Sequence, residues 1–127
     1  METVLLVDDN ALRASIRRSA LESNAASVVR VPDAAEALCS VETPEMAGTL
    51  GLVISGHQMT GISGPEFVAE LRGRMPGVPV LVVGLAAGLE REYQGIDGVY
   101  FAGNPTAEEL RRLARELLGG VGVLQTA

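Results

Sequence analysis

The stretch Leu52-Val53-Ile54-Ser55-Gly56-His57-Gln58-Met59-Thr60-Gly61-Ile62-Ser63-Gly64-Pro65 decides the fold of this 127-residue chain. A short apolar run bounded by glycine is typical of a buried strand. A polar loop follows, and Pro65 suits the first turn of a helix, where its missing N–H costs no hydrogen bond. Functional sites of open α/β sheets lie at the carboxyl ends of the strands. The sequence therefore predicts a site around position 56, which holds a glycine.

Apolar strands and amphipathic helices alternate on both sides of this stretch. The predicted strands are residues 3–7, 27–31, 52–56, 78–83 and 99–102. The predicted helices are 11–23, 34–41, 65–75 and one that begins after Thr106, with a short helix within 84–95 and a linking loop at 42–49. Such alternation implies right-handed crossovers and a parallel sheet covered on both faces. The predicted fold class is α/β, a five-stranded doubly wound sheet of the flavodoxin-like type with strand order 2-1-3-4-5.

Two of the helices carry clear apolar stripes. In the predicted helix 11–23, Leu12, Ile16 and Ala20 share one face, and the arginines at 13, 17 and 18 are expected to point away from it. The last helix has its own stripe, made of Leu110, Leu113, Leu117 and Leu118. We expect one domain over residues 1–120, with residues 121–127 as a tail or linker.

Composition excludes several classes of function. The net charge of −6 leaves no basic surface for phosphates, so nucleic acid is not expected as a direct partner. No apolar run is long enough to span a bilayer, and no signal peptide is recognisable, so we expect a cytoplasmic protein that does not enter membranes. One cysteine and one histidine argue against a disulfide framework or a zinc site.

The carboxyl ends of the predicted strands converge on a small set of residues: Asp8, Asp9, Gly56, Gly84, Asn104 and Pro105. The motifs Val4-Leu5-Leu6-Val7-Asp8-Asp9-Asn10 and Met59-Thr60-Gly61-Ile62-Ser63-Gly64, with Asn104-Pro105 before the last helix, resemble the receiver domains of two-component response regulators. The resemblance covers nearly the whole chain in register. Around Ser63-Gly64-Pro65-Glu66-Phe67 the chain is similar to receivers fused to hybrid histidine kinases.

The resemblance implies a role for each of these positions. Family receivers bind Mg²⁺ with an acidic pair, phosphorylate an Asp after the third strand, and hold the phosphoryl group with a hydroxyl and a Lys. Four positions of this chain match the pattern: Asp8 and Asp9 as the acidic pair, Phe101 as the aromatic switch residue, and Pro105 as the proline after the Lys position. Three depart from it: Gly56 at the acceptor, Gly84 at the hydroxyl and Asn104 at the Lys.

These departures change the expected chemistry. Glycine has no nucleophile, so an aspartyl phosphate cannot form at position 56. Mg²⁺ prefers near-octahedral oxygen ligands, so Asp8 and Asp9 alone are expected to hold it weakly or not at all. By resemblance, the Asn104–Pro105 peptide bond is expected to be cis. The sequence thus indicates a pseudo-receiver without a cofactor.

The leading hypothesis is a non-enzymatic module of a two-component phosphorelay that acts by protein contact. The partners implied by the resemblance are a histidine kinase, another receiver or an output domain, and a homodimer is also considered. In family receivers a common contact face combines the fourth helix, fifth strand and fifth helix, which here carries Tyr100 among mixed charges.

Two alternatives stay open. One is a flavodoxin-like domain that binds a nucleotide or another small ligand, although no glycine-rich phosphate loop follows the first strand. The other is a structural domain of a larger signalling protein.

Overall fold

The structure is a computed structural model that describes residues 2–22, 27–57, 59, 61–84 and 87–119. The strands are β1 (Thr3–Val7), β2 (Ser27–Val31), β3 (Leu50–Gly56), β4 (Val80–Val83) and β5 (Val99–Ala102). The helices are α1 (Ala11–Glu22), α2 (Ala34–Ser40), α3 (Pro44–Thr49), α4 (Gly64–Arg74) and α5 (Ala107–Leu118), with the 3₁₀ helix η1 (Leu89–Tyr93). The predicted tail 121–127, and Thr60 in the predicted loop, lie outside the described residues.

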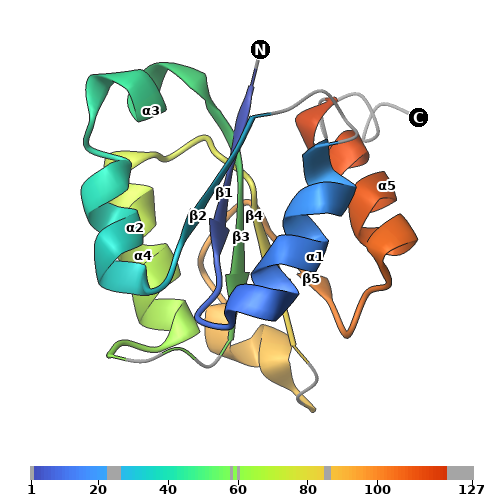
Figure 1. The fold of residues 1–127 in the computed structure, drawn as a ribbon. Coiled ribbons are helices and arrows are strands. Elements are labelled where there is room, and N and C mark those ends of the chain that lie inside the picture. Colours follow the sequence, from blue (N-terminus) through green and yellow to red (C-terminus); the bar gives the residue numbers. More distant parts are fainter. Residues whose placement is uncertain (1, 23–26, 58, 60, 85–86, 120–127) are drawn as a thin grey trace.

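The strands form one parallel sheet in the order β2-β1-β3-β4-β5, which confirms the predicted fold class. In Figure 1 the strand arrows all point downward, so every carboxyl end lies at the lower edge of the sheet. The chain leaves β1 toward β2 on one side and reaches β3 on the other. This reversal between β1 and β3 opens a crevice at that edge, where ligands bind in sheets of this type.

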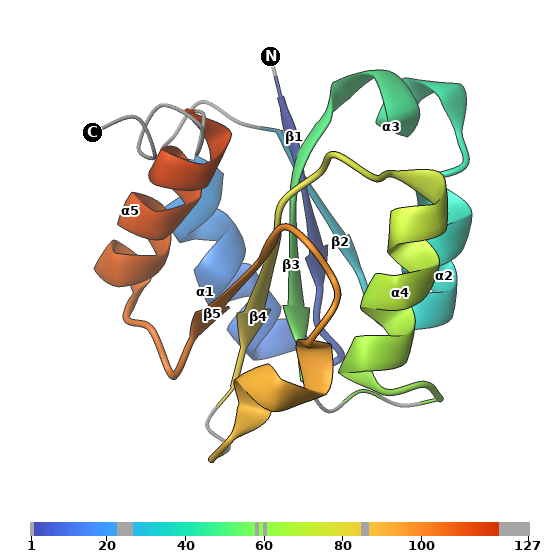
Figure 2. The same ribbon diagram turned by 180° about the vertical axis from the view of Figure 1, so that it is seen from behind.

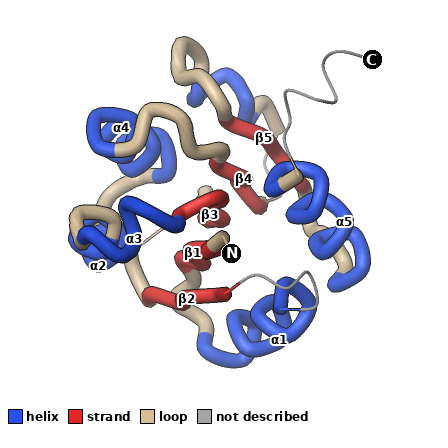
Figure 3. The backbone as a smooth tube through the Cα atoms, turned by 90° about the horizontal axis from the view of Figure 1, so that it is seen from above, coloured by secondary structure: helices blue, strands red, loops and turns tan. Residues whose placement is uncertain are grey.

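Helices cover both faces of the sheet, as Figure 3 shows from above. Side chains along β1 alternate between the two layers. Val4 and Leu6 pack in the core beneath α1 and α5, whereas Leu5 and Val7 pack in the core beneath α2 and α4. Both sets are buried, which explains why the strand is apolar from Val4 to Val7.

Side-chain caps fix where several helices begin. The Asp33 carboxylate accepts a hydrogen bond from the backbone N–H of Glu36 at 2.8 Å, and the predicted cap at Thr106 is confirmed by a bond from the Glu109 backbone at 3.1 Å. Ser63 starts α4 in the same way, within a capping box. These caps therefore fix the residues at which the helices after the carboxyl-edge loops begin.

Several predicted boundaries were wrong. Residues 42–49 were expected to be a linking loop, but Pro44–Thr49 form α3. The sequence signal is a threonine N-cap followed directly by proline: Thr43 Oγ1 accepts a hydrogen bond from the Met46 backbone at 3.3 Å. The short helix expected within 84–95 is present, as the 3₁₀ helix η1. It lies near the carboxyl edge, seen from behind as the light-orange turn in Figure 2. β4 begins at Val80 rather than at position 78.

The predicted inner face of α1 was wrong at two of its three positions, since Ala20 is buried as expected but Leu12 and Ile16 are not. Leu12 is 74% exposed and Ile16 is 57% exposed, whereas Ala14 and Leu21 are buried. Ala14 and Leu21 lie seven residues apart, about two turns, so they define the face that packs on the sheet. The helix is turned so that Leu12 and Ile16 face solvent. The stripe of the last helix is confirmed, since Leu110 and Leu117 are buried and Leu113 and Leu118 pack against the same core. None of the helices in the described ranges has the length and apolar character that crossing a bilayer requires.

Two glycines of α4 give a matched test of packing. Gly64 is buried, and a Cβ built there would collide with the Tyr93 hydroxyl and lie 2.8 Å from the backbone oxygen of His57. Gly64→Ala is therefore expected to lower the free energy of unfolding by about 1–3 kcal/mol. A Cβ at Gly73 meets nothing within 4 Å, so Gly73→Ala is expected to raise it by about 0.5 kcal/mol. Urea unfolding followed by circular dichroism measures both, and equal stabilities of the two variants would contradict the predicted collision.

Candidate functional site

Asp8 lies directly after β1 at the centre of the carboxyl edge. It is only 4% exposed. Its backbone N–H donates to the carbonyl of Val31 at 3.0 Å, which extends the pairing of β1 with β2 by one residue. Its Oδ1 accepts a hydrogen bond from the backbone N–H of Asn10 at 3.0 Å. The backbone therefore holds this carboxylate in place, facing the cavity.

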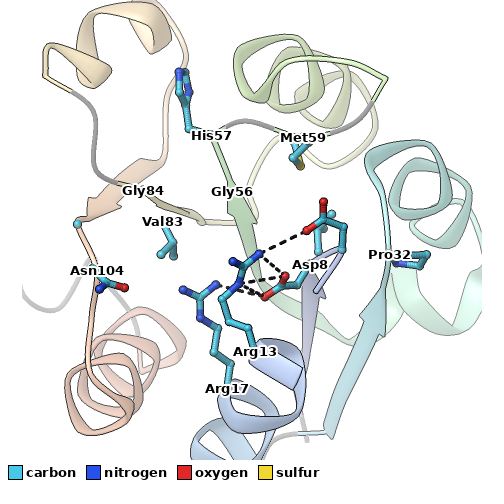
Figure 4. Close-up of a pocket in the computed structure, with 13 residues that line it drawn as sticks. Asp8, Arg13, Arg17, Pro32, Gly56, His57, Met59, Val83, Gly84 and Asn104 are labelled. Atoms are coloured by element: carbon cyan, nitrogen blue, oxygen red, sulfur yellow. Dashed lines mark hydrogen bonds and ion pairs between the residues drawn. The ribbon is translucent and has the colours of Figure 1, made fainter. Parts of the chain in front are cut away.

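Two arginines of α1 hold the Asp8 carboxylate from the other side, as Figure 4 shows. Arg13 Nη2 lies 2.6 Å from Oδ1, and Arg13 Nε lies 3.0 Å from Oδ2. Arg17 Nη1 lies 3.3 Å from Oδ2. The prediction that both arginines point away from the sheet was wrong. They are one helical turn apart on the helix that follows Asp8, so both side chains can reach back to it.

These contacts decide the charge state of Asp8. Burial alone pushes the pKa of its carboxyl group upward. Hydrogen bonds from Arg13 and from the Asn10 backbone, together with the positive charges of Arg13 and Arg17, lower this pKa by more than burial raises it. The net pKa of Asp8 is below its ordinary value, so the group is ionised at neutral pH. The same pairing raises the pKa of Arg13, whereas burial lowers the pKa of Arg17.

Asp9 does not share this environment. Its side chain is 62% exposed and, among the described residues, pairs with Arg13, with 3.4 Å between Oδ1 and Nη2. The two predicted pocket acids thus differ, although both line the cavity: the Asp8 carboxylate is buried and hydrogen-bonded, whereas the Asp9 side chain is largely exposed to solvent. Over the residues that the structure describes, no three side chains of His, Cys, Asp or Glu are grouped as a metal would require.

The donor set does not fit the Mg²⁺ that the family resemblance implies. Mg²⁺ needs oxygen ligands in near-octahedral geometry. Both oxygens of Asp8 already accept N–H groups, and two guanidinium groups lie within 3.3 Å of them. A divalent cation would have to displace those arginines and be held by exposed Asp9. The positive charge that pairs with Asp8 comes from the Arg13 and Arg17 side chains of α1.

A cavity of about 440 Å³ brings the predicted site positions together. Gly56, Gly84 and Asn104 line it with Asp8 and Asp9. The missed residues are Arg13, Arg17 and His57. The available signal for the arginines was their spacing, one turn apart on the helix that directly follows an acidic strand end.

His57 was expected to be an exposed loop residue pointing away from the site, and its side chain is only 13% exposed. Its Nδ1 lies 3.0 Å from the Tyr93 hydroxyl and its Nε2 lies 3.4 Å from Glu92 Oε2. Burial, and then the charge of Glu92, raise the pKa of Tyr93 to about 12. In Figure 4 the ring is directed away from Asp8. His57 therefore ties the loop after β3 to η1.

Two predicted positions lie outside the cavity lining. Phe101 packs edge-on against Tyr93, with ring centroids 5.3 Å apart, in the core beneath α2 and α4. Pro105 was expected to follow a cis peptide bond, and that was wrong, because no peptide bond among the described residues is cis. Asn104 is exposed and makes no hydrogen bond within the described ranges. Nothing in this part of the loop therefore offsets the ordinary preference for trans.

Solved structures with the same architecture are receiver domains. A response regulator receiver domain protein from Clostridium thermocellum is 18% identical, with 98% of this chain and 99% of that chain covered and a TM-score of 0.81. A chemotaxis response regulator of Vibrio cholerae is 22% identical over 92% of this chain and 98% of that chain, with a TM-score of 0.80. The receiver domain of a Pseudomonas aeruginosa sensor histidine kinase is 19% identical over 94% and 98%, with a TM-score of 0.79, and holds a magnesium ion in its active site cleft.

The fold, with an acidic residue at the end of β1, defines a doubly wound α/β domain with a cavity at the carboxyl edge of its sheet. The model of the response regulator receiver domain family matches residues 4–97, which is most of the chain. The chain therefore belongs to the response regulator receiver domain family, the receiving component of two-component signalling. No curated protein matches it.

Proposed function

We propose that this receiver domain acts in a two-component pathway by protein contact, without accepting a phosphoryl group at position 56. One observation carries the proposal. Gly56 ends β3 and lines the cavity beside Asp8, at the position where the family resemblance places the acceptor carboxylate. A glycine there offers no side-chain oxygen to attack phosphorus.

The rest of the cavity supports the same proposal. Gly84 has no hydroxyl group, and Asn104 has no ammonium group, to stabilise a transferred phosphoryl group. The oxygens of Asp8 accept hydrogen bonds from Arg13 and Arg17, which occupy the positions that a metal ion would need. The acceptor position, the metal site and the positions that hold the phosphoryl group therefore all depart from the family pattern.

Neighbouring nucleophiles do not replace the missing acceptor. Ser55 is 1% exposed and pairs in register with Val82, which packs in the core beneath α2 and α4. Its Oγ is therefore shielded from a donor in the cavity. His57 has both ring nitrogens directed at Tyr93 and Glu92.

Incubation with acetyl phosphate and Mg²⁺ is expected to leave the intact mass of the protein unchanged. A phosphorylatable receiver domain treated in parallel should gain one phosphoryl group, because its acceptor carboxylate and metal site are present. Mass spectrometry without acid treatment preserves a labile acyl phosphate. A stoichiometric adduct on this chain would overturn the proposal, and the corresponding peptide would identify the acceptor.

The proposed partners are those that the family implies: a histidine kinase, another receiver or an output domain, with a homodimer as one case. The α5 charges of the predicted contact face are partly paired within the helix, as in Arg112 with Glu116 at 3.1 Å. Leu12 and Ile16 on α1 are the exposed large hydrophobic residues of the described chain. We therefore include α1 in the proposed contact surface. Residues 1–120 are proposed as one domain, and 121–127 as its tail.

A further inference from the structure

A groove opens at the amino edge of the sheet, opposite the cavity of the carboxyl edge. Its volume is about 540 Å³. The apolar part of its lining comes from both core layers. Leu50 and Met75 pack against the core beneath α2 and α4, whereas Tyr100 and Leu118 pack against the core beneath α1 and α5. These four residues are only half-buried, so the two layers reach the surface together at this edge.

The charged residues of the groove do not favour a charged ligand. Among the described residues that line it, these are Glu2 and Arg74. Arg74 is already paired, with Nε 2.8 Å from Glu42 Oε2 and Nη1 3.1 Å from Glu70 Oε1. Glu2 is exposed, so water screens the charge of its carboxylate. The groove therefore suits an uncharged apolar occupant.

The sequence that follows α5 has this uncharged, apolar character. It reads Gly120-Val121-Gly122-Val123-Leu124-Gln125-Thr126-Ala127, and none of these side chains is charged, although 20% of the residues of the whole chain are. Three large apolar side chains fall within the four positions 121–124. Removing such side chains from water is favourable in proportion to the apolar area that is buried. Segments that stay in solvent are typically poor in these residues.

The end of α5 brings this segment to the groove. The Gly119 N–H donates to the Arg115 carbonyl at 2.8 Å, and this bond closes the last turn of the helix. Leu118, the last helical residue, itself lines the groove. In Figure 1 α5 ends at the upper edge of the sheet, which is the amino edge. An extended chain spans at most about 3.6 Å per residue, so Leu124 can lie up to roughly 22 Å from Leu118. The segment is therefore long enough to turn back over the groove wall that Leu118 forms.

We propose that residues 121–124 of this chain occupy the groove at the amino edge, with their apolar side chains against Leu50, Met75 and Tyr100. A second copy of the chain offers the same segment, but a segment tethered to Leu118 has an effective concentration on the order of millimolar. The tethered segment therefore fills the groove at protein concentrations too low for dimerisation. The inference is independent of the proposed function, because the groove lies at the other edge of the sheet from Gly56.

Nuclear Overhauser contacts in the 127-residue chain test the proposal directly. Contacts are expected between the methyl groups of Val123 and Leu124 and the ring protons of Tyr100. They should be equally strong in dilute and in concentrated protein, because the segment and the groove belong to one molecule. An absence of contacts would overturn the proposal. Contacts that appear only in concentrated protein would also overturn it, since the segment would then come from a second copy.

Two double variants with the same added charge separate docking from a general charge effect. Val123→Asp with Leu124→Asp places two carboxylates in the proposed contact, so the contacts to Tyr100 should disappear. The Tm should fall by about 4 °C or more, the scale of one lost apolar contact in a domain of this size. Gln125→Asp with Thr126→Asp adds the same charge just beyond the contact and should leave the Tm and the contacts nearly unchanged. Equal shifts in both variants, or no shift in the first, would overturn the proposal.

Discussion

Asp8→Asn is expected to lower the free energy of unfolding by about 3 kcal/mol, the lower end of the range for removing one partner of a buried ion pair. The substitution keeps an oxygen for the Asn10 backbone N–H. It removes the negative charge that compensates Arg13 and Arg17, and Arg17 is only 16% exposed. The lower end applies because the Arg13 side chain is 50% exposed and can turn into water. Urea unfolding at neutral pH measures the difference.

Asp9→Asn is the matched control for this effect. Its side chain is 62% exposed and forms an exposed ion pair with Arg13 at 3.4 Å. The expected change is below about 0.5 kcal/mol, as for other surface ion pairs. Equal losses for the two variants would show that the buried pairing does not stabilise the fold.

The pH dependence of the Asp8 variant follows from its pKa. Because the folded-state pKa of Asp8 is lowered, the ionised group stabilises the fold at pH values above its unfolded-state pKa. That contribution is lost as pH falls through the folded-state pKa. The difference in unfolding free energy between wild type and Asp8→Asn should therefore be largest near neutral pH and shrink in acid. A difference that grew in acid would contradict the assigned direction.

Restoring the family's site residues is expected to fail unless the arginines are also replaced. The triple variant Gly56→Asp, Gly84→Thr, Asn104→Lys supplies the acceptor, hydroxyl and ammonium groups. Asp8 still accepts hydrogen bonds from Arg13 and Arg17, so a divalent cation lacks its ligand. The triple variant should show no Mg²⁺-dependent phosphorylation by acetyl phosphate.

Adding Arg13→Met and Arg17→Met to the triple variant should change this outcome from no adduct to a measurable one. The change removes the guanidinium donors from both oxygens of Asp8, beside the new carboxylate at position 56, and leaves the Asn10 backbone N–H on Oδ1. Intact mass with and without Mg²⁺ provides the measurement, and circular dichroism checks that each variant folds. Phosphorylation of the triple variant alone would show that the arginine contacts with Asp8 do not exclude the metal.

Local signals in the sequence predicted most of the fold. Apolar runs bounded by glycine or acidic residues predicted the five strands, because a parallel strand is buried on both faces. Caps such as Asp33 and Thr106 predicted helix starts. α3 was missed because it has only six residues, too few for an apolar period to be recognised.

The site was predicted less completely, for a physical reason. Backbone topology places Asp8, Gly56 and Gly84 at one edge, and that much follows from strand order. Charged residues of α1 were assigned to solvent by helical periodicity alone. An arginine side chain is long enough to leave the face on which its Cα lies, so Arg13 and Arg17 could satisfy a buried carboxylate. Helical periodicity does not predict how far a long side chain extends beyond the face on which its Cα lies.

The guanidinium groups at Asp8 also differ from a metal ion in how their positive charge is supplied. A bound metal ion is a separate species, so its occupancy follows the free ion concentration and falls when a chelator competes for it. The positive charge beside Asp8 is covalently attached through α1 and has no dissociation equilibrium of its own. This positive charge is therefore present whatever the ionic composition of the surroundings, and only substitution of Arg13 and Arg17 removes it.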